Sequence, residues 1–140
     1  MELIKIHPPA VHFAIVLPVA LLILDLYYRF SGKKPDKLHL IFTLLASLSV
    51  VVGAVSGVLA HEPIEEKLET IEVFETHEVL GIFLALYFVS LTGLRLFLHR
   101  IPPVVFTLLT LLGVLMLFLQ GNLGGSIVYD HMIVPWLRSH

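Results

Sequence analysis

The sequence contains no cysteine, and this absence excludes several kinds of site. Disulfide bonds, thiolate metal sites, iron–sulfur clusters and covalent C-x-x-C-H haem attachment all require cysteine. Charge is also scarce, because only 14% of the 140 residues are charged. The chain has no glycine-rich phosphate loop and no basic stripe, so we expect no nucleic-acid partner. Since most carboxylates lie in one loop, the 8 histidines are the main candidate ligands.

Apolar residues, by contrast, make up 57% of the chain, and the mean hydropathy is +0.93. A membrane-spanning helix needs about 20 consecutive, mostly apolar residues. Four runs meet this requirement: residues 9–28, 38–60, 77–97 and 102–120. We therefore predict an all-α integral membrane protein. Residues 1–140 form one domain, a four-helix up-down-up-down bundle in contact with lipid.

The basic residues are unevenly distributed, and their distribution predicts the orientation. Six of the 9 lysines and arginines lie in the loops after the first and third runs: Arg29, Lys33, Lys34, Lys37, Arg95 and Arg100. Cytoplasmic loops of membrane proteins are the ones enriched in Lys and Arg. We expect a multi-pass protein of the inner cell membrane. Both termini and the acidic loop at 61–78 then lie on the outer, periplasmic side.

Most histidines fall on that outer side, at the ends of all four predicted helices: His7, His12, His61, His77 and His131. A single histidine at a helix end is usually an interfacial polar residue. Ionisable groups near the bilayer are costly, however, and a set at one membrane level indicates a binding site. Imidazoles suit Zn, Cu, Ni or haem iron.

Small residues share the helix faces of two of these histidines. Gly53 and Gly57 precede His61 at intervals of four, and Gly81 follows His77 at the same interval. Residues four apart lie on one face of a helix. Such strips are typical of close helix packing. Alternatively, Gly57 and Gly81 are cofactor-binding residues that make room for a flat macrocycle beside its ligands.

Two prolines separate the expected roles of His7 and His12. Pro8 and Pro9 suit the first turn of a helix, and the residue before a proline is disfavoured in helical conformation. We therefore place His7 outside the first helix and His12 inside it.

A bis-histidine haem b requires two imidazoles that face each other across the bundle. The first and third spanning helices are diagonal in the predicted topology. We predict His12 and His77 as the iron ligands, with His61 and His131 as the alternative pair. His7 is expected to be an accessory contact to the cofactor.

The acidic loop predicts a short amphipathic helix between the second and third spans. Pro63 is a helix-start signal, and Ile64, Leu68 and Ile71 recur at helical spacing among acidic residues. We expect this helix to lie on the outer membrane surface, and Thr76 to cap the third spanning helix.

The segment after the fourth run is rich in glycine. Gly121, Gly124 and Gly125 are expected to end the helix there. Tyr129 suits either an interfacial aromatic belt or a contact to the cofactor. His131 is interpreted as a lid residue or as a ligand.

Three stretches together resemble one family. "HPPAVHF" before the first long helix, "HEVLG" in the third and "GGSIVYDH" after the fourth are similar to motifs of the bacterial membrane family called domain of unknown function 2231. Here Ala14 stands where that family often has proline, and Met132 where it often has glycine. The resemblance implies a four-helix, haem-containing electron carrier, without naming a reaction.

Three functional hypotheses follow. The first is a membrane b-type cytochrome that moves electrons between periplasmic redox proteins and the quinone pool. The second is an outer-face binding protein for Zn or Cu, and the third is a structural membrane subunit, with a homodimer as a further arrangement. Ser126 and His131 have no third residue with which to form a catalytic triad, so the sequence gives little support for nucleophilic catalysis. Whether the protein is an enzyme stays open. Asp25 is interpreted as a residue of a helix interface.

Overall fold

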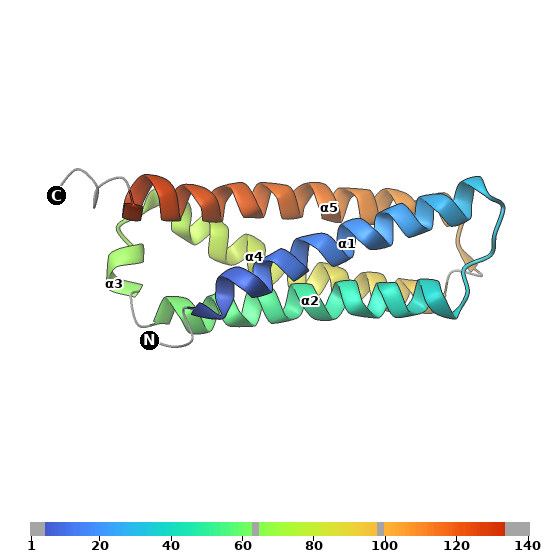
Figure 1. Ribbon diagram of the computed structural model, residues 1–140, viewed down its shortest axis with the longest axis horizontal. Helices are drawn as coiled ribbons and strands as arrows, with labels where there is room; N and C mark the ends of the chain where they lie inside the picture. The colour runs from blue at the N-terminus through green and yellow to red at the C-terminus, as the bar shows by residue number, and fades with distance from the viewer. Residues whose placement is uncertain (1–4, 63–64, 98–99, 134–140) are drawn as a thin grey trace.

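The computed structural model describes residues 5–62, 65–97 and 100–133. The long helices are α1 (His7–Phe30), α2 (Lys37–His61), α4 (Glu72–Leu96) and α5 (Pro103–Ser126). One helical turn, α3 (Glu65–Leu68), lies between α2 and α4, and a π-helical segment (Ile127–Ile133) continues α5. Consecutive long helices run antiparallel along one axis (Figure 1). The predicted all-α up-down-up-down bundle is therefore confirmed.

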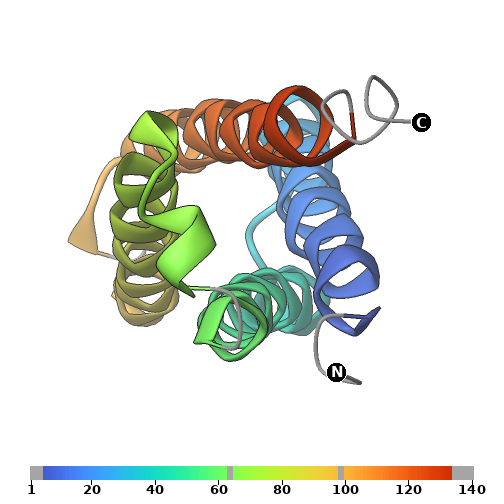
Figure 2. The ribbon, with the colours of Figure 1, turned by 90° about the vertical axis from the view of Figure 1, so that its left-hand side faces the viewer.

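The four long helices form a closed ring. Each packs against the next long helix in the chain, and α5 packs against α1. Viewed along the bundle, α1 stands diagonally opposite α4, and α2 stands opposite α5 (Figure 2). All four helices are long and apolar enough to cross a membrane. Their outward faces carry exposed Leu, Ile, Val and Phe side chains, as expected for helices surrounded by lipid.

Local sequence explains where α1 and α2 begin. Pro8 and Pro9 lie in the first turn of α1, where a missing backbone N–H removes no helical hydrogen bond. Helix α1 nevertheless begins at His7, so the expectation that His7 lies outside the helix is wrong. Asp36 caps α2 by accepting hydrogen bonds from the backbone N–H groups of Leu38 and His39.

Two predicted boundaries also differ from the structure. Helix α4 begins at Glu72 rather than at residue 77, so Thr76 lies inside the helix and is not its cap. The first turn of α4 carries Glu72 and Glu75. Acidic side chains stabilise the N-terminus of a helix, but a hydropathy criterion leaves them out of the predicted apolar run. Helix α5 passes through its late glycines and ends at Ser126, because a spanning segment satisfies its backbone groups best as a helix.

The core of the bundle separates two polar ends. Its fully buried large side chains include Leu21, Leu84, Phe88 and Phe106. The end that holds His7, His61 and His77 is called here the histidine end, and the opposite one the Asp25 end. At the histidine end Leu68 of α3 is buried with Phe74 and Ile127. Pro63 and Ile64, where the loop helix was expected to begin, lie outside the described residues. The placement of this helix on a membrane surface stays a prediction.

Candidate metal centre

Three histidines converge at the histidine end. His7 is the first residue of α1, His61 the last of α2, and His77 lies in the second turn of α4. One ligand nitrogen from each lies within 4.8 Å of the other two. The His61 ring is 5.8 Å from the His7 ring and 6.0 Å from the His77 ring, measured between centroids. His77 is buried, and the other two are half-buried.

His12 does not join this cluster. Its side chain is exposed, and its Nδ1 lies 2.6 Å from the backbone oxygen of Pro8. At roughly 100° per residue, positions five apart on a helix point about 140° away from each other. His7 and His12 therefore cannot share a face once both are helical. The face of His7 continues through the buried residues Ala14 and Pro18, which is the sequence signal that would have identified it.

Glycines provide the space for the imidazole rings. A Cβ atom at Gly57 would lie 3.0 Å from Cε1 of His7, and one at Gly124 would lie 2.9 Å from Cε1 of His77. Both contacts are too close for a side chain without movement of the ring. From the sequence, Gly57 was expected to make room for a cofactor and not for the His7 ring. Gly124 was not recognised as part of the site.

The other two strip glycines accept different neighbours. A Cβ at Gly53 would lie 3.0 Å from Cβ of Ala14, which is close packing of α1 on α2. A Cβ at Gly81 would lie 3.0 Å from Nε2 of Gln120, which donates a hydrogen bond to the backbone oxygen of His77. Gly81 thus makes room for an amide from α5. Gln120 was not recognised from the sequence, because its partner lies 43 positions away.

The second ring nitrogens of the three histidines have different surroundings. Nδ1 of His7 lies 3.0 Å from Oγ of Ser56. Nδ1 of His61 is 3.9 Å from Oε1 of Glu78, too far for a hydrogen bond. Nδ1 of His77 is buried and has no hydrogen-bond partner among the described residues.

The three histidines border a cavity of about 440 Å³. Most of its lining is apolar, with His12 and Tyr129 also in the wall. Six glycines from three helices take part: Gly53, Gly57, Gly81, Gly121, Gly124 and Gly125. Cavities of about 300–1,000 Å³ are typical of sites for small molecules and cofactors. A bare metal ion would need far less space, whereas imidazoles beside an apolar cavity suit a metal held in an organic ring.

A family model described as "Predicted membrane protein (DUF2231)" matches residues 3–134. The chain belongs to this family. No curated protein and no solved structure matches it. The matched range contains all four apolar helices and the three clustered histidines of the DUF2231 domain. Family and helices together establish a multi-pass membrane protein.

The remaining predicted site residues of this DUF2231 protein lie in the π-helical segment. Tyr129 is 64% exposed and lies in the cavity wall. His131 is exposed and is not part of the three-histidine cluster. Ser126 donates a hydrogen bond to Oδ2 of Asp130, 2.9 Å away, and not to His131. The structure thus brings His7, His61 and His77 together and leaves His131 apart.

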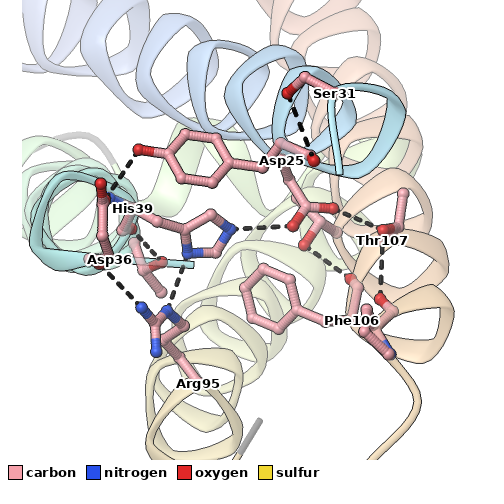
Figure 3. A network of polar contacts seen from close by, with 11 residues as sticks. Asp25, Ser31, Asp36, His39, Arg95, Phe106 and Thr107 are labelled. Carbon is pink, nitrogen blue, oxygen red and sulfur yellow. Dashed lines mark hydrogen bonds and ion pairs between the residues drawn. The ribbon is translucent and has the colours of Figure 1, made fainter. Parts of the chain in front are cut away.

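A second polar group occupies the Asp25 end and joins all four long helices (Figure 3). Oδ1 of buried Asp25 lies 2.9 Å from Nε2 of His39, and Oδ2 accepts a hydrogen bond from Thr107, 2.5 Å away. Arg95 donates from Nε to Nδ1 of His39 at 2.8 Å, and from Nη2 to the backbone oxygen of Asp36. The interpretation of Asp25 as an interface residue agrees with this arrangement, but its partners were not recognised.

The Arg95 contact determines which nitrogen of His39 carries hydrogen. Arginine only donates, so Nδ1 of His39 is the acceptor and Nε2–H donates to Asp25. His39 is therefore neutral and links a guanidinium to a carboxylate. At the edge of this group, the hydrogen bond from the Tyr28 hydroxyl holds the pKa of the Asp36 carboxyl below its usual value.

Proposed function

We propose that this protein binds haem b at the histidine end and carries electrons. The observation that supports the proposal is the position of His7 and His77, on diagonal helices beside an apolar cavity of about 440 Å³. This pair replaces His12 and His77 as the residues that would hold the iron, because His12 is not part of the cluster. The His61 ring lies 5.8 Å from the His7 ring and 6.0 Å from the His77 ring, measured between centroids, and would contact the same group.

The residues present fit such a group in their chemistry. All three donors are imidazoles. Three buried polar atoms at the site lack hydrogen-bond partners among the described residues: Nδ1 of His61, Nδ1 of His77 and Oε1 of Gln120. When bound, haem supplies reversible one-electron chemistry at its iron. His7 and His77 would hold it, and the apolar lining would keep water from it.

The location of the site suggests its partners. With the basic loops in the cytoplasm, the histidine end lies at the outer face of the inner membrane. There it would receive electrons from, or deliver them to, a periplasmic redox protein and the quinone pool of the membrane.

A bare Zn or Cu ion is the second candidate, and a specific observation favours it. Nitrogens of His7, His61 and His77 all lie within 4.8 Å of one another. A tetrahedral zinc site with Zn–N bonds of about 2.0–2.1 Å places its nitrogens roughly 3.3 Å apart. Side-chain movements of about an ångström would therefore bring all three around one ion.

One preparation tests both candidates. The full chain is produced in haem-supplied cells, purified in detergent, and examined by optical spectroscopy and elemental analysis. We expect one low-spin haem per chain, with split bands on reduction. A colourless protein with stoichiometric Zn or Cu would reject haem in favour of the ion. A colourless protein without metal would reject both.

A further inference from the structure

A serine of α2 contacts one histidine of the cluster. Ser56 is buried, and its Oγ lies 3.0 Å from Nδ1 of His7. The same Oγ donates its single hydrogen to the backbone oxygen of Gly53, 2.9 Å away. A backbone oxygen only accepts, so the Gly53 and His7 contacts are both hydrogen bonds only when Oγ donates to Gly53 and Nδ1–H of His7 donates to Oγ.

Two further contacts hold the ring in this orientation. Cε1 of His7, the atom between the two ring nitrogens, lies against Gly57. A Cβ atom at Gly57 would lie 3.0 Å from it. The His61 ring meets the His7 ring edge to face, at an interplanar angle of 74°. With Nδ1 occupied by Ser56, Nε2 is the nitrogen left with a lone pair for a metal.

We propose that Ser56 is a positioning residue that fixes His7 as the Nδ1–H tautomer and so presents Nε2 to the cofactor. Metal-bound histidines commonly donate their second N–H to a fixed acceptor, which sets both tautomer and ring orientation. Nδ1 of His61 and Nδ1 of His77 have no hydrogen bond among the described residues. His7 is thus the pre-oriented ligand of the three. The tautomer is a property of the protein without cofactor, and only the affinity consequence rests on the proposed function.

The chain offers a matched control for Ser56. Ser49 is also a buried serine of α2, and its Oγ donates to the backbone oxygen of Ala46, three residues earlier, as Ser56 does to Gly53. Ser49 has no histidine partner among its hydrogen bonds. Ser49→Ala therefore removes the same kind of hydroxyl-to-backbone hydrogen bond within α2 without touching the cluster.

The test is nitrogen NMR of the full chain, labelled with 15N-histidine and purified in detergent without haem or metal. At about pH 8 an ordinary imidazole is neutral, so its tautomer is visible in the ring-nitrogen shifts. A His7→Gln variant identifies the His7 signals. We expect the Nδ1–H form in the native chain, in Ser49→Ala and in Ser56→Thr, which keeps a hydroxyl. Ser56→Ala should populate the Nε2–H form. An Nε2–H tautomer in the native chain, or no change in Ser56→Ala, would overturn the proposal.

A second measurement adds the cofactor. Titration with Zn²⁺ and with ferric haem should show Ser56→Ala about 10- to 100-fold weaker than Ser49→Ala for whichever probe binds. Equal affinities in the two variants would also overturn the positioning role. If neither probe binds the native chain, the proposed function fails, and the tautomer measurement alone decides the role of Ser56.

Discussion

Neighbouring glycines have different surroundings at the histidine end. Gly124 lies against the His77 ring, whereas a Cβ at the adjacent Gly125 would meet no atom within 4 Å. Sequence spacing alone does not distinguish the two, because the contact depends on where α4 crosses α5. The same limit applies to the histidines. Their gathering at one end was predictable from the helix ends, but the pairing of His7 with Ser56, 49 positions apart, was not.

Substituting Gly124 tests the fit around His77. Gly124→Ala places a methyl carbon 2.9 Å from Cε1 of His77, which is too close, so the ring must shift. Overpacking of this kind costs about 1–3 kcal/mol. We expect roughly tenfold or greater loss of affinity for the bound haem or metal in Gly124→Ala, measured by titration. Gly93→Ala is the control, because a Cβ there meets no atom within 4 Å and Gly93 is not in the cavity wall; it should bind as the native chain does. Equal binding by both variants would show that His77 is not held against Gly124 in the loaded protein.

Single histidine substitutions test which of the histidines bind the iron. His7→Ala and His77→Ala should each abolish the low-spin haem spectrum, because each removes one imidazole of the diagonal pair. His12→Ala should retain it, since His12 is exposed and bonded to its own helix. Absorption and magnetic circular dichroism of the three purified variants provide the measurement. Loss of haem in His12→Ala together with retention in His7→Ala would restore the pair predicted from sequence.

At the scale of helices, hydropathy located all four spans, but the ends of the helices differ from the ends of the apolar runs. Charged side chains at helix ends and the need to hydrogen-bond the backbone within the membrane explain the difference. Helix α4 extends five residues beyond its apolar run because acidic side chains stabilise a helix N-terminus. The polar contacts between helices were not predictable, since Thr107 lies 82 positions from Asp25 and Arg95 lies 56 from His39. These contacts do not form a proton path through Arg95. An arginine stays protonated, so it cannot relay a proton to His39.

The Asp25 end provides a paired test of helix association. Thr107→Val removes a hydroxyl donor from a buried carboxylate, and hydrogen bonds to charged groups contribute about 1.5–3 kcal/mol. Thr110→Val is the control, because Thr110 is also buried in α5 but bonds the Phe106 oxygen of its own helix. We expect Thr107→Val to lower the free energy of unfolding in detergent by about 2 kcal/mol more than Thr110→Val. Equal losses would mean that the Asp25 contact does not stabilise the bundle.

On the scale of the whole molecule, the two polar groups lie at opposite faces of the membrane. His77 and Arg95 are 18 positions apart on α4, which corresponds to about 27 Å of helix. The hydrocarbon core of a bilayer is about 30 Å thick. Between them lies the apolar core around Leu84, Phe88 and Leu91. The histidine site thus lies toward one side of the membrane, and the charge of the loops predicts which side that is.

The absence of cysteine makes this orientation directly testable, since one introduced cysteine is the only thiol in the chain. Lys34 lies in the basic loop between α1 and α2, and Glu69 lies between α3 and α4. Both side chains are exposed, so accessibility to a thiol reagent depends on the side of the membrane. We expect a membrane-impermeant maleimide to label Glu69→Cys in cells with a permeabilised outer membrane, and Lys34→Cys only after the inner membrane is broken. The reverse pattern would place the histidine end in the cytoplasm and exclude periplasmic redox proteins as its partners.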